Sequence, residues 1–201
     1  MDIEEFKIAV DALDNPADLT DFCRKQFLHG IPFVFRGEEE NYYEFRKRIG
    51  QKFDIAYHEV LITGSAKLGF SPHKAKEFDY DSDIDVSIVS NSLFEKFMDN
   101  ILDFQWNLRE AREKVQFEEI KMYNQFLHYI ALGWMRPDKL PVSFQMKVIK
   151  GDWFNYFESL SNGGSEVGNY KVNCGVFKSY SHLELYLEKG LVAFQKVKID
   201  G

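Results

Sequence analysis

Cysteine is scarce in this chain of 201 residues, where Cys23 and Cys174 are the only two. Two thiols are too few for a disulfide framework, and these two lack the short spacing that zinc ligands share. We expect both to be free thiols inside the fold, because an unpaired cysteine usually behaves as a small apolar residue.

Long apolar runs and a targeting segment are also missing. No stretch approaches the roughly 18 consecutive apolar residues that a membrane helix needs. The chain begins with MDIEEFKIAV, which is acidic from the start and places no basic segment before an apolar one, as a signal peptide would. These absences predict a cytoplasmic protein with no membrane partner.

Positive charge is in deficit as well. The 32 acidic residues outnumber the 25 Lys and Arg residues, which gives a formal net charge of −7. A protein built mainly to hold duplex nucleic acid is usually basic, because neutralisation of the phosphates drives that binding. Duplex nucleic acid is therefore not expected as the main ligand, and the sequence does not indicate an oligomeric state.

Aromatic residues, in contrast, are plentiful. The 19 Phe, 10 Tyr and 3 Trp residues predict an aromatic-rich core. The length is typical of one domain, and we expect a single domain over residues 1–201 with a helical N-terminal part over 1–53.

The periodicity of apolar residues predicts both helices and strands. Helices are expected over 3–13, 16–29, 38–53, 92–135 with a break near 104–107, 152–160 and 181–198. Strands are expected over 59–63, 84–89, 142–149 and 170–177. This order predicts an α+β fold, with a small mixed sheet, helices packed on one side of it, and further helices at the N- and C-termini.

One segment stands apart chemically, because Asp83 and Asp85 lie two residues apart where a strand is expected to begin. The period of two in a strand puts both carboxylates on one face, while Ile84, Val86 and Ile88 point to the core. Two adjacent carboxylates repel each other unless a cation lies between them. Hard oxygen ligands with room for phosphate and water favour magnesium.

Upstream of this pair, the expected strand over 59–63 ends at Gly64-Ser65. A Gly-Ser turn that opens a helix exposes backbone N–H groups and a hydroxyl, which together can bind an anion. If the two strands are neighbours, this turn and the carboxylates face each other across the space that a metal-bound triphosphate would fill.

These residues resemble the nucleotidyltransferases of the DNA-polymerase-β-like superfamily, particularly the minimal, stand-alone bacterial-type members. The signature of that superfamily is an apolar strand, Gly-Ser, and then Ser-Asp-x-Asp at the next strand. Over residues 58–90 this chain matches it with Gly64, Ser65, Ser82, Asp83 and Asp85. The resemblance therefore implies a nucleotidyltransferase-like domain whose motif core is residues 58–90.

The resemblance also implies an activity, namely transfer of an NMP from an NTP to a hydroxyl with release of pyrophosphate. Asp83 and Asp85 would be catalytic and hold one or two Mg²⁺ ions, while Gly64, Ser65 and Ser82 would bind the nucleotide. Many relatives carry Arg where this chain has Leu68, and the adjacent Lys67 could contact the phosphates instead. The acceptor could be a protein, RNA, a nucleotide or a small molecule, and analogy suggests toxin–antitoxin or anti-phage signalling.

A third carboxylate usually completes the metal site of this superfamily, on a later antiparallel strand beside the first two carboxylates. The expected strand over 142–149 offers only Ser143, Gln145 and Lys147 on its polar face, with Gln145 in the middle. Gln145, water, Asp79 or Asp81 could take that place. The alternative is a catalytically inactive nucleotide-binding or protein-interaction scaffold on the same fold.

Overall fold

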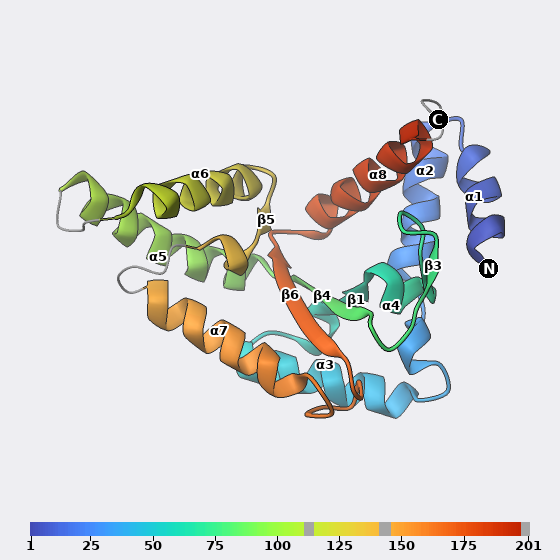
Figure 1. Ribbon diagram of the computed structural model, residues 1–201, viewed down its shortest axis with the longest axis horizontal. Helices are drawn as coiled ribbons and strands as arrows, with labels where there is room; N and C mark the ends of the chain where they lie inside the picture. The colour runs from blue at the N-terminus through green and yellow to red at the C-terminus, as the bar shows by residue number, and fades with distance from the viewer. Residues whose placement is uncertain (111–114, 141–145, 198–201) are drawn as a thin grey trace.

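The computed structural model describes residues 1–110, 115–140 and 146–197 (Figure 1). It has a mixed α and β architecture, with one four-stranded mixed sheet and a separate two-stranded hairpin. The strands are β1 (Val60–Thr63), β2 (Phe70–Ser71), β3 (Lys76–Glu77), β4 (Asp83–Val89), β5 (Trp134–Met135) and β6 (Lys171–Phe177).

Helices make up most of the rest of the described chain. The α-helices are α1 (Ile3–Asp11), α2 (Pro16–Cys23), α3 (Glu39–Phe53), α4 (Gly64–Leu68), α5 (Asn91–Arg109), α6 (Phe117–Ala131), α7 (Met146–Leu160) and α8 (Tyr180–Val197). Shorter turns are the π-helix η1 (Arg24–Leu28) and the 3₁₀ helices η2 (Phe33–Phe35), η3 (Tyr57–Glu59) and η4 (Pro137–Lys139). None of the helices in the described ranges combines the length and the apolar character that crossing a membrane requires.

The strand order in the larger sheet is β1-β4-β6-β5. Strand β4 pairs antiparallel with β1 and parallel with β6, and β5 closes the other edge antiparallel to β6. In this register Asp85 lies opposite Thr63 on one side and opposite Asn173 on the other. The centre of the sheet therefore brings together three segments that are far apart in the sequence.

The two faces of the sheet carry two separate hydrophobic cores. Alternate residues of β4, Ile84, Val86 and Ile88, join the larger core with side chains from α3, α5, α6 and α7. On the other face Val89 and Phe177, at the far ends of β4 and β6, pack with α1, α2 and α8. Figure 1 shows α5, α6 and α7 on one side of β6, and α1, α2 and α8 on the other.

Several sequence predictions are confirmed. Strands form where 59–63, 84–89 and 170–177 predicted them, and α1, α3 and α8 match the predicted helices closely. The mixed sheet of an α+β fold is also present. The expectation that helices lie on one side describes the larger core only, because the terminal helices cover part of the opposite face.

Two predictions were wrong. The strand expected over 142–149 is contradicted from Met146 onward, where α7 begins, because Trp153, Phe157 and Leu160 bury one helical stripe of α7 in the larger core. The helical prediction over 92–135 was wrong in its break and its end. Helix α5 continues through 104–107 to Arg109, and α6 ends at Ala131, before strand β5.

Candidate functional site

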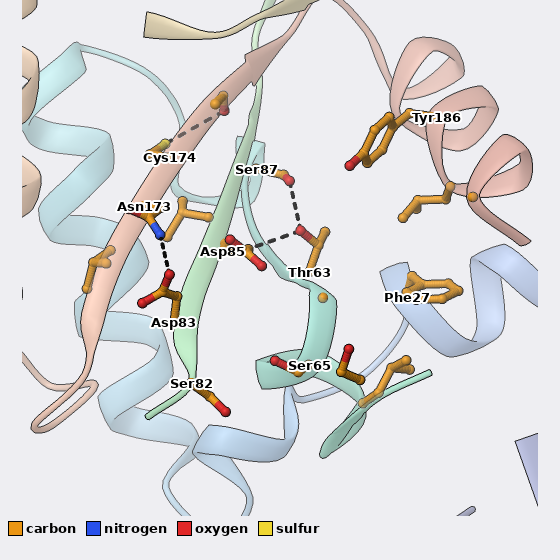
Figure 2. A pocket seen from close by; sticks show the side chains of 18 of the residues that line it. Phe27, Thr63, Ser65, Ser82, Asp83, Asp85, Ser87, Asn173, Cys174 and Tyr186 are labelled. Atoms are coloured by element: carbon orange, nitrogen blue, oxygen red, sulfur yellow. Dashed lines mark hydrogen bonds between the residues drawn. The ribbon is translucent and has the colours of Figure 1, made fainter. Parts of the chain in front are cut away.

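The two carboxylates lie at the start of β4 and face a cleft of about 1180 Å³. Asp83 and Asp85 are exposed, whereas Ile84 and Val86, the residues that alternate with them, are buried. Figure 2 shows both carboxylates on β4, between the side chains of β6 and those of β1. The predicted placement of the pair on one face of a strand is therefore what the structure has.

The Gly64 turn lies directly against one of these carboxylates. Gly64 has φ +65°, and a Cβ atom built on it would lie 2.7 Å from Oδ2 of Asp85. Positive φ is costly for other residues, and a side chain at this position would displace the carboxylate of Asp85. The pairing of Thr63 with Asp85 in the sheet produces this close approach. Glycine at position 64 thus allows the backbone turn and also leaves room for the carboxylate of Asp85.

The electrostatics of Asp85 are unusual. The side chain can be reached from the cleft, yet protein atoms crowd most of its carboxylate, and burial raises its pKa to about 6. The negative charge of Asp83 raises this pKa further, and the ammonium group of Lys74 acts in the opposite direction. The structure therefore concentrates negative charge at a position where a bound cation would relieve it.

Strand β6 places two polar side chains beside the pair. Asn173 lies opposite Asp85 in the parallel register, and its Nδ2 donates a 3.0 Å hydrogen bond to Oδ2 of Asp83. Lys171 lies opposite Asp83 and lines the same cleft. Neither residue was predicted as part of the site from the sequence. The alternation of polar Lys171 and Asn173 with apolar Val172 and Cys174 was the signal that could have found them.

The loop before β4 is organised by Asp79. Oδ1 of Asp79 accepts a 3.1 Å hydrogen bond from Oγ of Ser82, and Oδ2 forms a 2.7 Å ion pair with Nζ of Lys76. The hydrogen bond from Lys76 is the main cause that lowers the pKa of Asp79. Ser82 and Asp81 line the cleft, as does Ser65 at the start of α4. Asp79 is thus engaged in shaping the loop.

The structure does not bring Lys67 to the cleft. Its side chain is buried, and its ammonium group donates hydrogen bonds to the backbone carbonyls of His29 and Gly30, the latter at 2.9 Å. Burial lowers the pKa of Lys67 to about 8. The cleft is lined instead by Lys74, Lys76 and Lys171. Gln145, the candidate for the third ligand position, lies outside the described residues.

Across the cleft from the carboxylates lies Tyr186, on α8 (Figure 2). Burial and then the charge of Asp85 raise the pKa of this phenol. Trp134 and Arg136, from β5 and the residue after it, line the same cleft. None of these three residues was predicted as part of the site. Trp134 was assigned to a helix over 92–135, and Arg136 and Tyr186 carried no motif that set them apart.

Within the described ranges, no third acidic side chain joins the pair. In the part of the chain that the structure describes, no group of three or more His, Cys, Asp and Glu side chains is arranged to hold a metal ion. The oxygen ligands beside the turn are the carboxylates of Asp83 and Asp85, and Asn173 directs its amide nitrogen toward Asp83. Carboxylate oxygens are hard donors of the kind that magnesium accepts.

Comparison with known proteins identified no relatives of this chain. No family model, no curated protein and no solved structure matches it. The functional argument therefore depends on the residues of the cleft themselves.

Proposed function

We propose that the chain is a magnesium-dependent nucleotidyltransferase, which transfers an NMP from an NTP to a hydroxyl acceptor. The observation that carries the proposal is the close approach of Gly64 to Asp85. A Cβ atom built on this glycine would lie 2.7 Å from Oδ2 of Asp85. This close approach joins the Gly-Ser turn and the Asp-x-Asp pair, which are 18 to 21 residues apart in the sequence, into one site. The mixed sheet that carries them is compatible with the nucleotidyltransferase fold.

The residues present fit a magnesium ion. Asp83 and Asp85 would hold it, and Asn173 is a neutral neighbour that donates a hydrogen bond to Asp83. The raised pKa of Asp85, caused by burial and then by Asp83, marks a place where a cation would stabilise the carboxylate. When bound, the ion would neutralise phosphate charge and lower the pKa of the attacking hydroxyl.

The side chains around this position have separate tasks in the proposed reaction. The hydrogen bond from Asn173 orients the carboxylate of Asp83. Lys171 and Lys74 supply positive charge to the phosphates, and the hydroxyl of Ser65 offers them a hydrogen bond. The acceptor oxygen forms a bond to the α-phosphorus as the bond to the bridging oxygen breaks. Pyrophosphate leaves, and the hydroxyl proton passes to solvent.

A second candidate is a nucleotide-binding scaffold without catalysis. The observation that favours it is Asn173: the residue that β6 places opposite Asp85 is a neutral amide and adds no third carboxylate to the pair. Both candidates predict binding of magnesium and NTP, and only the enzyme predicts turnover.

The experiment that separates the two candidates uses α-labelled ATP, GTP, CTP and UTP with magnesium, first with the protein alone and then with cell extract. We expect label transfer by the wild type and a loss of more than about hundredfold in Asp83→Asn, because neutralisation of transition-state charge contributes several kcal/mol. The matched control is Glu77→Gln, which removes the same charge from another acidic residue of the same cleft and should retain transfer.

Three outcomes are informative. Transfer that Asp83→Asn abolishes and Glu77→Gln retains supports the enzyme. Nucleotide binding without transfer by the wild type supports the scaffold. If magnesium with NTP raises the melting temperature no more than either alone, both candidates fail, because ligand binding to the folded state must stabilise it.

A further inference from the structure

The cleft has two chemically different ends. At one end are the two carboxylates and the lysines, with Lys171 opposite Asp83 at the start of the parallel strands. Toward the other end lie the aromatic rings of Trp134 and Tyr186, from β5 and α8, and Tyr186 faces the carboxylates across the cleft. A nucleotide has the same polarity, because its phosphates are anionic and its base is a flat aromatic ring.

The aromatic end is built on a glycine. A Cβ atom on Gly175 of β6 would lie 2.8 Å from Nε1 of Trp134, so the indole lies close over the strand where a side chain would otherwise stand. Glycine inside a strand weakens it and often marks a place where another group approaches closely. Phe177, two residues further along β6, stacks on Trp134 with the ring planes 3° apart and the centroids 5.6 Å apart.

Tyr186 adds a second ring to this end. Its centroid is 4.6 Å from that of Trp134, and the two planes are inclined by 52°. The residue remains 47% exposed, so part of its ring is open to a ligand. Figure 2 shows the Tyr186 side chain reaching from α8 toward the carboxylates.

Arg136 fixes the position of the indole. Its guanidinium lies 5.3 Å from the centroid of Trp134 and 5.1 Å from that of Tyr129. Nε and Nη2 of Arg136 donate hydrogen bonds of 3.1 and 2.8 Å to the carboxylate of Asp138. Arg136 is therefore a positioning residue, and Trp134 is held before any ligand arrives.

The spacing of the two ends fits one nucleoside. In the parallel register Asn173 lies opposite Asp85, and Gly175, beneath the indole, is two residues further along β6. At the usual rise of a strand, this separation is about 7 Å along the sheet. A ribose can bridge such a gap between phosphates at the carboxylates and a base at the aromatic rings.

We propose that Trp134 and Tyr186 form the nucleobase subsite of this cleft. The nucleotide then lies along β6, with its base at Trp134 and Tyr186 and its outer phosphates toward Lys171 and Lys74. This inference rests on the proposed function, because it takes the carboxylate end as the phosphate site. Stacking accepts every base, so all four NTPs are expected to bind.

The test compares inorganic tripolyphosphate with the four NTPs, each with magnesium, by calorimetry. In the wild type, every NTP should bind more tightly than tripolyphosphate. Tyr186→Ala should weaken NTP binding by about ten- to hundredfold, the usual contribution of one stacked base, and leave tripolyphosphate binding unchanged. Tyr186→Phe keeps the ring and should keep the NTP affinity, whereas Lys171→Ala should weaken both ligands.

A spectroscopic measurement gives a second readout. NTP should quench tryptophan fluorescence in the wild type, and tripolyphosphate should not. Because the chain has two other tryptophans, Trp106 and Trp153, the quenching should disappear in Trp134→Phe if it arises at this subsite.

The outcomes separate the failure of the subsite from the failure of the proposed function. If tripolyphosphate binds and NTP binds no more tightly, or if Tyr186→Ala weakens both equally, the nucleobase subsite is overturned and the phosphate site stands. If neither ligand binds with magnesium, the proposed function is overturned together with the subsite.

Discussion

The two faces of strand β4 carry opposite chemistry within seven residues. One face presents Ile84, Val86 and Ile88 to the larger core, and all three are at most 3% exposed. The other face presents Asp83 and Asp85 to the cleft, where like charges lie close together. The first face stabilises the fold by apolar burial.

This contrast between the two faces shows which residues of β4 are needed for folding alone. Replacing an apolar residue of the core face would expose or empty the core, whereas the carboxylates on the other face repel each other and raise the pKa of Asp85 through burial and charge. Groups that a fold retains at such a cost are frequent at functional sites. The predictions below test this division between the two faces.

The largest effect is expected when a carboxylate is moved from the cleft face to the core face. Val86→Asp buries a charge without a partner, and should lower the free energy of unfolding by about 4 kcal/mol or more. The matched control, Lys171→Asp, adds the same side chain on the cleft face of the neighbouring strand, and should cost about 1 kcal/mol or less. Urea denaturation measures both. Equal losses would contradict the division between the two faces.

Local features of the fold and the site could be predicted from the sequence, whereas non-local features could not. The period-two pattern of Asp83 to Ile88 was sufficient to predict β4 and the side of the strand on which each residue lies. The Gly64-Ser65 turn was predicted from the end of an apolar strand. Both are local features, in which the backbone geometry follows from neighbouring residues.

The rest depended on contacts between distant segments. The register that places Asn173 opposite Asp85 is a parallel pairing across 88 residues, and the sequence of β6 alone does not determine it. Lys67 was assigned to the phosphates because it stands next to Leu68, where many members of the resembled superfamily carry Arg. A five-residue helix instead turns its side chain toward the carbonyls of His29 and Gly30. A sequence does not show on which side of so short a helix a lysine emerges.

The strand predicted over 142–149 failed for a related reason. A short alternation of apolar residues is compatible with a helix if a longer helical stripe follows it. Phe53 packs against Trp153 and Phe157, with centroid distances of 4.9 and 5.8 Å, so the stripe is buried and the helix extends back to Met146. Tertiary packing thus decided between two local patterns.

An intermediate effect is expected at the contact between the turn and the cleft face. Gly64→Ala imposes a side chain at φ +65° and places its Cβ 2.7 Å from Oδ2 of Asp85. We expect a loss of about 2 to 3 kcal/mol in the free energy of unfolding. The control is Gly37→Ala, where φ is +80° and no atom lies within 4 Å of the added Cβ, so only the backbone cost of about 1 kcal/mol applies.

A double-mutant cycle then isolates the contact. In an Asp85→Ala background, Gly64→Ala should cost no more than Gly37→Ala, because the carboxylate that it meets is gone. An unchanged cost in that background would show that Gly64 is required by the turn alone. Glycine at position 64 would then not be needed to make room for the carboxylate of Asp85.

The smallest effect is expected from neutralising the carboxylate itself. Burial and then the charge of Asp83 raise the pKa of Asp85 from 3.8 to about 6 in the folded protein. Between pH 4 and 6 the unfolded chain therefore binds fewer protons at this residue than the folded chain does, so its contribution to stability falls as the pH rises. This loss of stability is complete above about pH 6, and it is absent below about pH 4.

Asp85→Asn removes this titration. The variant should melt at the same temperature as the wild type near pH 4, and above it at pH 7. Since water reaches the carboxylate from the cleft, we expect a modest gain in melting temperature, on the order of 2–4 °C.

Lys74→Ala should enlarge the pH-dependent difference between wild type and Asp85→Asn, because Lys74 lowers the pKa of Asp85. Saturating magnesium should raise the melting temperature of the wild type at pH 7 and leave Asp85→Asn nearly unchanged. If the gain of Asp85→Asn were the same at pH 4 and pH 7, it would come from packing of the amide, and the electrostatic account of the cleft face would be wrong.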